Sequence, residues 1–186
     1  MKRLVDLMLA LVAMLFLLLP IIMVAVLVKL TSKGPVLYWS DRVGKNNAIF
    51  KMPKFRTMKV DTPAVATHLL TDHKRFLTPV GDFLRKSSLD ELPQLWCILK
   101  GDMSFVGPRP ALFNQADLIA LRTRKGVHDL VPGLTGWAQI NGRDELPIPQ
   151  KVDLDVEYLN HQSLWMDIEI IWLTFIKVLK KDGVCH

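Results

Sequence analysis

LMLALVAMLFLLLPIIMVAVLV, residues 7–28, is a run of 22 residues without a charged side chain. One helix of this length spans about 33 Å, which is close to the thickness of the hydrocarbon core of a bilayer. A cleaved signal peptide is disfavoured because the run is long and residues 29–33 offer no cleavage site of small residues. We therefore predict that the segment is retained and enters a membrane.

The flanking charges and Pro20 bear on how this segment lies in the membrane. Lys2 and Arg3 precede the run and two lysines follow it, which is typical of ends that both stay on the cytoplasmic side. Pro20 removes a helix hydrogen bond and kinks the chain. A re-entrant, proline-broken helix over residues 1–30 satisfies both observations. The alternative is a transmembrane helix that tolerates its proline.

The remaining residues, 31–186, leave room for one modest domain. In the whole chain of 186 residues, 24 Lys and Arg stand against 18 Asp and Glu, so the formal net charge is +6. This charge favours anionic partners, and by itself it allows nucleotides, phospholipid head groups or nucleic acid. Cys97 and Cys185 form neither a disulfide framework nor a zinc motif, and the histidines lack metal-ligand spacing.

The domain is predicted to be α+β and mainly α. Residues 35–39 and 49–58 have the character of two short strands around a polar loop, which indicates a small β-hairpin. Helices are predicted at residues 79–86, 115–125, 151–160 and 165–181. The last of these is amphipathic, with two tryptophans on its apolar arc and lysines at its polar end. It therefore suits a membrane surface, with packing on the domain core as the alternative.

An acidic pair, Asp90 and Glu91, stands at the predicted start of another helix. Ser88 and Glu91 have the spacing of a capping box, which would explain both acids as groups that stabilise the helix. Pro93, however, makes the first turn irregular. The apolar residues of this stretch also gather on the side away from Asp90. Asp90 is therefore expected to be free to meet a ligand.

Several cations stand near this pair or on stiff turns. Arg85 precedes the pair, Arg109 lies between two prolines, and Arg143 follows an Asn-Gly turn. Lys54 belongs to the second predicted strand. A rigidly held arginine is suited to bidentate recognition of phosphate.

Asp155 lies at the margin of the apolar stripe of the helix at residues 151–160. A carboxylate buried there needs a cation, a metal or a hydrogen-bond donor, because an unpaired buried charge is costly. A structural salt bridge and a ligand contact are both compatible with this position.

Four stretches together resemble the bacterial sugar transferase family of monotopic phosphoglycosyl transferases. They are the N-terminal anchor, KFRTM at 54–58, SSLDELPQLWCILKGDMSFVGPRP at 87–110 and PGLTGWAQINGR at 132–143. The resemblance covers nearly the whole chain. Family members often have Ser before the anchor proline and Asn after the aromatic residue of the acidic motif, where this chain has Leu19 and Cys97. The first departure leaves the details of the bend open.

The resemblance implies a ping-pong reaction at the cytoplasmic face of a bacterial inner membrane. In it Asp90 attacks the β-phosphate of a UDP-sugar and releases UMP, and a phosphosugar-aspartyl intermediate remains. Polyprenyl phosphate, usually undecaprenyl phosphate in this family, then takes the sugar phosphate as the first membrane step of glycoconjugate synthesis. The implied fold has a re-entrant anchor at residues 1–30, and residues 31–186 form a compact helical catalytic domain with membrane-surface helices.

The resemblance also implies roles for individual residues and partners. Asp90 is the nucleophile and a ligand of the required Mg²⁺, and Glu91 assists at the metal or the reacting phosphate. The implied substrate-binding residues are Arg109, Arg143, Arg85, Lys54 and Asp155. The implied partners are the UDP-sugar, the polyprenyl phosphate and inner-leaflet phospholipid, without nucleic acid and with a homodimer left open.

Two other functions fit the same residues. A membrane-anchored phosphohydrolase would use water instead of polyprenyl phosphate to resolve the aspartyl intermediate. A basic membrane scaffold without activity would use the two acids only to cap helices. Neither the sugar nor the biosynthetic pathway follows from the sequence.

Overall fold

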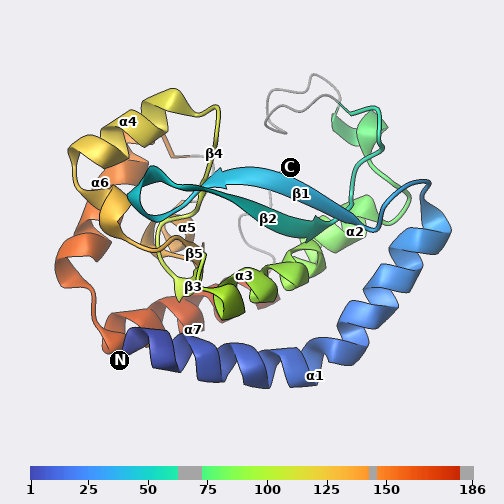
Figure 1. The fold of residues 1–186 in the computed structure, drawn as a ribbon, viewed down its shortest axis with the longest axis horizontal. Helices are drawn as coiled ribbons and strands as arrows, with labels where there is room; N and C mark the ends of the chain where they lie inside the picture. Colours follow the sequence, from blue (N-terminus) through green and yellow to red (C-terminus); the bar gives the residue numbers. More distant parts are fainter. Residues whose placement is uncertain (63–72, 143–145, 181–186) are drawn as a thin grey trace.

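The computed structural model of the chain describes residues 1–62, 73–142 and 146–180. Its longest element is α1 (Lys2–Thr31), a helix of 30 residues that is long and apolar enough to cross a membrane. The helix continues through Pro20, because a proline removes only one backbone donor from an otherwise regular helix. Its axis changes direction along its length as it follows one edge of the molecule (Figure 1). The hydrogen-bonded helix is continuous across Pro20, and the kink at Pro20 and the re-entrant path stay predictions.

Helix α1 packs on the rest of the chain at both of its ends. Near its N-terminus Ala10 joins a core with Met52 and Ile98. Near its C-terminus Val24 and Val28 join a second core, one helical turn apart on the same face. In the middle of the helix one face packs on these cores through Met14, Leu17 and Ile21. The opposite face, with Leu15, Phe16 and Leu19, is exposed.

The predicted β-hairpin is confirmed. Strands β1 (Leu37–Val43) and β2 (Ile49–Phe55) pair antiparallel, with Leu37 opposite Phe55 and Val43 opposite Ile49. The turn between them places Asn46 and Asn47 at positive φ, a conformation that Asn tolerates better than most residues. The first strand begins later and extends further than predicted, because β4 (Ala111–Leu112) pairs with its end.

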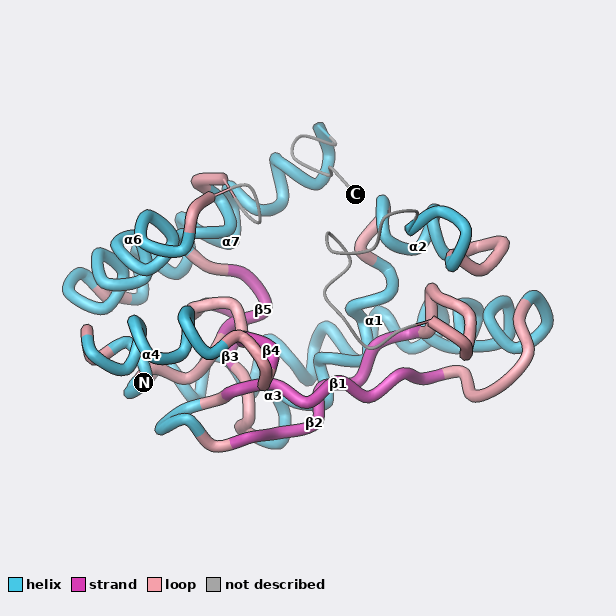
Figure 2. The backbone as a smooth tube through the Cα atoms, turned by 90° about the horizontal axis from the view of Figure 1, so that it is seen from above, coloured by secondary structure: helices cyan, strands magenta, loops and turns pink. Residues whose placement is uncertain are grey.

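The remaining elements make the domain mainly helical, as predicted. They are η1 (Lys45–Asn47), η3 (His73–Phe76), α2 (Gly81–Lys86), η4 (Leu89–Gln94), α3 (Leu95–Lys100), β3 (Ser104–Val106), α4 (Ala116–Arg124), η5 (Val127–Asp129), β5 (Gly133–Thr135), α5 (Trp137–Ile140), α6 (Ile148–His161) and α7 (Leu164–Lys180). Strands β3 and β5 form a short parallel pair. Seen from above, β1 and β2 lie on one side of the molecule, and α6 and α7 on the opposite side (Figure 2).

The capping box at Ser88 is contradicted. Ser88 adopts a left-handed conformation with φ of 56°, and its side chain makes no cap hydrogen bond. The element that follows is the 3-10 helix η4, which contains Pro93. Because the chain reaches η4 directly from α2, Ser88 closes a turn on Arg85 instead of capping a new α-helix. Glu91 is therefore available for other contacts.

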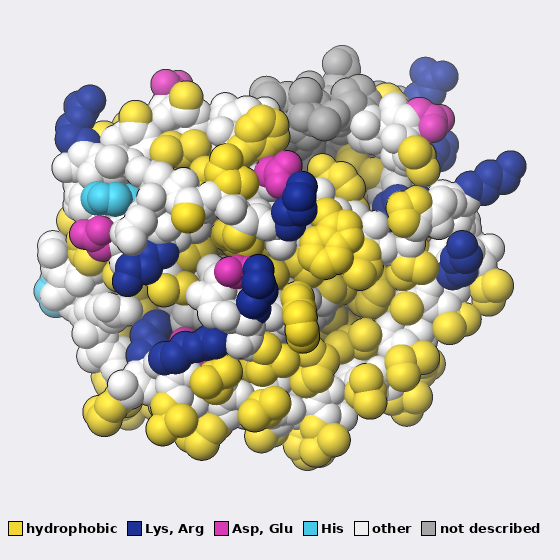
Figure 3. Space-filling model, in the orientation of Figure 1, with side chains coloured by type: hydrophobic (Ala, Val, Ile, Leu, Met, Phe, Trp, Pro, Cys, Tyr) yellow, Lys and Arg dark blue, Asp and Glu magenta, His cyan; other side chains and the backbone are white. Residues whose placement is uncertain are grey.

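Apolar side chains remain exposed on α1 and α7. Trp165, Ile168, Trp172 and Phe175 are exposed on α7, whereas Ile170 is buried in the core. In the space-filling view, hydrophobic side chains cover the edge along which α1 runs (Figure 3). Exposed apolar surface of this extent is typical of contact with a membrane or a partner. The placement of α7 on a membrane surface stays a prediction.

Candidate active site at the acidic pair

The acidic pair lies between the hairpin and the loop that carries Arg109. Asp90 and Glu91 belong to η4, which packs against β2, and Lys54 is the penultimate residue of that strand. The irregular 3-10 turn buries Asp90, of which only 7% is exposed. The sequence thus places two carboxylates on a short helix and a lysine on the strand beside it.

Glu91 binds two of the cations through one oxygen. Its Oε1 accepts hydrogen bonds from Lys54 Nζ at 2.7 Å and from Arg109 Nη2 at 3.3 Å. Burial alone would raise the pKa of Glu91, but Lys54 and Arg109 outweigh that effect and hold the pKa below its ordinary value. Glu91 is therefore ionised, and it orients the two cations that share its oxygen.

Asp90 is in a different situation from its neighbour. Within the described ranges, its carboxylate has no hydrogen bond or ion pair. Burial, with a smaller contribution from Glu91, raises the pKa of Asp90 to about 6, although Lys54, Arg85 and Arg109 oppose the shift. A buried carboxylate that no hydrogen-bond donor engages is predisposed to bind a metal or to attack an electrophile.

Arg85 completes the positive surroundings of Asp90. Its Nε donates to Thr57 Oγ1 at 2.9 Å, which ties the end of α2 to the segment after β2. Burial lowers the pKa of Arg85, while the nearby carboxylates of Asp90 and Asp82 raise it. A guanidinium stays protonated in any such environment, so Arg85 adds a permanent positive charge beside the acidic pair.

The backbone of the Arg109 loop is fixed on several sides. Gly107 N donates to Thr135 O at 2.9 Å, and a Cβ at Gly107 would lie 2.4 Å from Val131 O, so only glycine fits there. The carbonyl of Arg109 accepts a hydrogen bond of 2.7 Å from Arg122 Nη1. These contacts fix the backbone from which the Arg109 side chain extends toward Glu91.

Asp155 contacts the Arg109 loop indirectly, through the side chain of Arg122. Arg122 donates to Asp155 Oδ2 through Nε at 2.9 Å and through Nη2 at 2.7 Å, and Asp155 is only 2% exposed. The structural salt bridge, one of the two alternatives open from the sequence, is therefore the arrangement found. Asp155 positions Arg109 through Arg122 and has no opening to a ligand.

The structure thus unites Lys54, Arg85, Asp90, Glu91 and Arg109 and leaves Asp155 behind the loop. Arg143 lies outside the described residues. Arg122 was not predicted from the sequence. One indication was present, since Arg122 follows the apolar Leu118 by four residues and so shares the buried face of α4.

The site has few groups for a metal ion. No cluster of three or more His, Cys, Asp or Glu residues is found in the part of the chain that the structure describes. Mg²⁺ is commonly held by one or two carboxylates together with waters and substrate phosphates. The carboxylate of Asp90 fits that kind of site, whereas Glu91 Oε1 is already bound to two cations. The residues fit a metal that is shared with a diphosphate, not one held by the protein alone.

Comparisons with known proteins identify relatives along the whole chain. A family model described as bacterial sugar transferase matches residues 1–181. The chain is 42% identical over 185 residues to "Uncharacterized sugar transferase EpsL" of Bacillus subtilis, covering 98% of this chain and 89% of that protein. It is 41% identical over 184 residues to the UDP-glucose:undecaprenyl-phosphate glucose-1-phosphate transferase of Escherichia coli, covering 95% of this chain and 39% of that protein. A third relative is the undecaprenyl-phosphate galactose phosphotransferase of Salmonella typhimurium, 38% identical over 168 residues, with 81% of this chain and 34% of that protein covered.

The lengths of these relatives differ. The chain spans most of the Bacillus protein but less than half of the Escherichia and Salmonella transferases. The matched part of the longer relatives therefore corresponds to this chain, and each of them contains further sequence.

Proposed function

We propose that this chain, which belongs to the bacterial sugar transferase family, transfers a sugar 1-phosphate from a UDP-sugar to a polyprenyl phosphate and releases UMP. Relatives that are about 40% identical carry names for this type of transfer to undecaprenyl phosphate. The product would be the first membrane-bound intermediate in the assembly of a glycoconjugate.

The observation that carries the proposal is the contrast between two adjacent carboxylates. Glu91 is neutralised by Lys54 and Arg109, whereas Asp90 is buried with its pKa raised to about 6. A carboxylate that approaches a diphosphate meets like charge, so the surrounding cations must offset the repulsion. The cations of this site are arranged for that task, and Asp90 is the group they leave to react.

In the first step of the proposed reaction, a carboxylate oxygen of Asp90 forms a bond to the β-phosphorus of the UDP-sugar. The bond from that phosphorus to the oxygen bridging the two phosphates breaks, and its electron pair leaves with UMP. In the second step, a phosphate oxygen of the polyprenyl phosphate forms a bond to the same phosphorus. The carboxylate of Asp90 leaves with the electron pair of its bond and is restored.

The residues around Asp90 have distinct parts in both steps. Arg109 and Lys54 reach the phosphate oxygens while Glu91 keeps them in place, and Arg85 stabilises the charge that develops near Asp90. Asp90 would hold Mg²⁺ together with the diphosphate, and the ion would neutralise negative charge on the phosphates when bound. Arg143, which lies outside the described residues, is proposed to bind the nucleotide or its phosphates.

The membrane part of the proposal rests on α1 and α7. An acceptor with a polyprenyl chain requires an active site close to a lipid surface, and both helices expose apolar side chains. Because both ends of α1 pack on the same domain, a re-entrant helix with both ends on the cytoplasmic side of the inner membrane accommodates the contacts.

The test is transfer of a labelled sugar phosphate. Purified protein in bilayer discs would receive UDP-sugars with ³²P at the β-phosphate, Mg²⁺ and undecaprenyl phosphate. We expect label in the lipid extract in proportion to released UMP. Free labelled sugar phosphate without a lipid product would instead indicate a phosphohydrolase. A chain that releases no UMP with any donor would contradict both enzymatic functions.

A further inference from the structure

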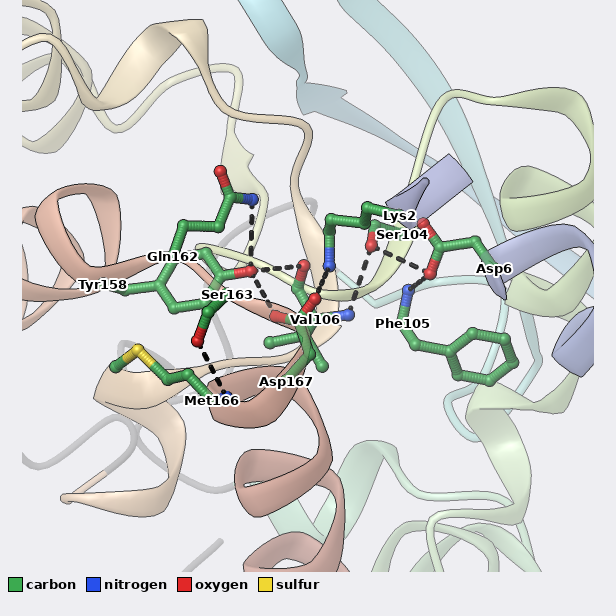
Figure 4. Close-up of polar contacts among 10 residues, drawn as sticks. All are labelled: Lys2, Asp6, Ser104, Phe105, Val106, Tyr158, Gln162, Ser163, Met166 and Asp167. Carbon is green, nitrogen blue, oxygen red and sulfur yellow. Dashed lines mark hydrogen bonds and ion pairs between the residues drawn. The ribbon is translucent and has the colours of Figure 1, made fainter. Parts of the chain in front are cut away.

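The first turn of α1 carries a group of charged residues that bind the catalytic domain. Lys2 Nζ lies 2.6 Å from Asp167 Oδ2 on α7, and Arg3 Nη2 donates to the carbonyl of Leu99 at 2.7 Å. Asp6 Oδ1 accepts hydrogen bonds from Phe105 N and from Ser104 Oγ, both at 3.1 Å. Figure 4 shows Lys2 and Asp6 directed at α7 and at the backbone of β3. These contacts join residues that are about one hundred or more positions apart in the sequence.

The carboxylates of this group are buried, which separates their contacts from ordinary surface ion pairs, whereas Arg3 itself is exposed. Asp6 is 6% exposed and Asp167 is 7% exposed, and Ser104 is buried as well. Asp167 also accepts a hydrogen bond of 2.6 Å from the buried Tyr158. A carboxylate at such depth is costly unless it is bonded, so the bonds of Asp6 and Asp167 favour one position of the turn.

Asp6 and Arg3 of this turn each bind a segment next to the active-site groups. Asp6 binds the backbone of β3, and only Gly107 and Pro108 separate that strand from Arg109. Arg3 binds carbonyls at the end of α3, the helix that continues η4 with Asp90 and Glu91. One turn of the membrane helix therefore connects the acidic pair to the loop of the arginine that binds it.

The distance between those two segments matters for the ion pair. Arg109 Nη2 lies 3.3 Å from Glu91 Oε1, near the upper limit of a hydrogen bond. A displacement of β3 by about 1 Å would therefore break this contact and move the guanidinium relative to Asp90. Among the described contacts, Asp6 accepts the hydrogen bond that joins α1 to the backbone of β3.

We propose that Asp6 is a positioning residue of the reaction: by holding the Phe105 amide it fixes the Arg109 loop against the acidic pair, so that the membrane helix is part of the active-site framework and more than an anchor. The role in catalysis rests on the proposed transfer function. The role in loop position does not, because it concerns the backbone of residues 104–109 alone.

The first experiment compares three variants by UMP release in bilayer discs. Asp6→Leu removes the acceptor, and we expect kcat to fall by about 30-fold or more. Asp6→Asn keeps an oxygen in the same place, so its activity should stay within about threefold of the wild-type chain. Leu4→Ala changes an exposed side chain on the same turn and serves as the matched control. All three proteins should remain in the membrane fraction.

The second experiment separates positioning from general damage to the fold. If Asp6 acts through Arg109, adding Asp6→Leu to Arg109→Ala should change kcat by less than about threefold, whereas independent effects would multiply. Full activity of Asp6→Leu, or multiplied losses in the double variant, would overturn the proposal.

The third measurement needs no activity. Peptides over residues 104–109 should exchange amide hydrogens faster in Asp6→Leu than in the wild-type chain, while α4 should be unchanged. If Asp6→Leu does not accumulate, Asp6→Ser, whose side chain is too short to reach Phe105, replaces it in all three experiments. Unchanged exchange over 104–109 would refute the positioning role. A wild-type chain without transfer activity would refute the proposed function, and the exchange data would still decide the role of Asp6.

Discussion

Arg122 holds Asp155 through two nitrogens, Nε and Nη2, that both donate to the same carboxylate oxygen. Both residues are buried, and the third nitrogen of Arg122 reaches the carbonyl of Arg109. This salt bridge lies behind the active site and supports the loop without facing the substrate.

Replacing Asp155 should destabilise the fold. Asp155→Ala leaves the guanidinium of Arg122 buried without its anion, which typically costs about 3–5 kcal/mol. Asp153 stands two positions earlier on the same helix and pairs with Lys125 at the surface, so Asp153→Ala should change the free energy of unfolding by less than about 1 kcal/mol. Urea denaturation in detergent would measure both. Equal changes in the free energy of unfolding for the two substitutions would show that the buried Arg122–Asp155 pair is no more stabilising than the surface pair.

Glu91→Gln should impair transfer without unfolding the chain. The amide keeps an acceptor oxygen but carries no negative charge, so it no longer neutralises Lys54 and Arg109. We expect kcat to fall by roughly 10²- to 10³-fold, as when an electrostatic group of a reaction is removed. Glu157→Gln, on the surface of α6, is the control and should retain activity. If Glu91→Gln transferred sugar phosphate at the wild-type rate, the charge of Glu91 would have no role in the reaction.

Asp90→Asn should abolish transfer and stabilise the protein at neutral pH. The pKa of Asp90 is about 6 in the folded chain, above the ordinary value of about 3.9, so the folded state binds the proton more tightly than the unfolded state. Between these two values the wild-type chain loses stability as the pH rises, by an amount on the order of 1–3 kcal/mol. The variant has no such loss, so its melting temperature should exceed that of the wild-type chain at pH 8 and match it near pH 4. A lower melting temperature of Asp90→Asn at pH 8 would contradict the raised pKa of Asp90 in the folded chain.

The rate of transfer should depend on the ionisation of Asp90. Only the carboxylate can attack phosphorus, so UMP release should decline as the pH falls through about 6. A magnesium ion at Asp90 favours the charged form, so higher Mg²⁺ concentrations should move this decline to lower pH. The measurement is the initial rate of UMP release from pH 4.5 to 8 at several Mg²⁺ concentrations. A decline that does not move with Mg²⁺ would place the ion away from Asp90.

The topology can be tested with a cysteine added before Met1 in a Cys97→Ser, Cys185→Ser background. Lys2 and Arg3 bind the same domain as the end of α1 does, so the added thiol should be hidden from a membrane-impermeant reagent in intact bacterial cells. It should react after permeabilisation. Labelling in intact cells would show that α1 crosses the membrane.

Local patterns in the sequence were sufficient for much of the fold. The hairpin formed by the predicted strands at residues 35–39 and 49–58 follows from strand patterning and turn chemistry, and it is found. Helices α4 and α6 follow from apolar spacing. The short parallel pair of β3 and β5 has three residues in each strand, which is too few to show a period.

The sequence indicated which residues make up the candidate site better than it indicated which hydrogen bonds and ion pairs join them. The acidic pair and the cations Lys54, Arg85 and Arg109 were singled out by residue type and nearby turns. The capping box was wrong because Ser88 takes a left-handed conformation that depends on the preceding helix. The partner of Asp155 and the contacts of Asp6 were not foreseen, since Arg122 and Phe105 meet them only after the chain has folded.

The exposed face in the middle of α1 has a consequence for the energetics of the whole molecule. Leu15 is 75% exposed and Phe16 is 76% exposed, so most of the surface of these side chains is not covered by the protein itself. In a bilayer the acyl chains would fill that space and act as a packing partner of the folded state, in the way a ligand stabilises the form to which it binds. Lipids of different chain length should therefore shift the melting temperature of this protein even when their head groups are identical.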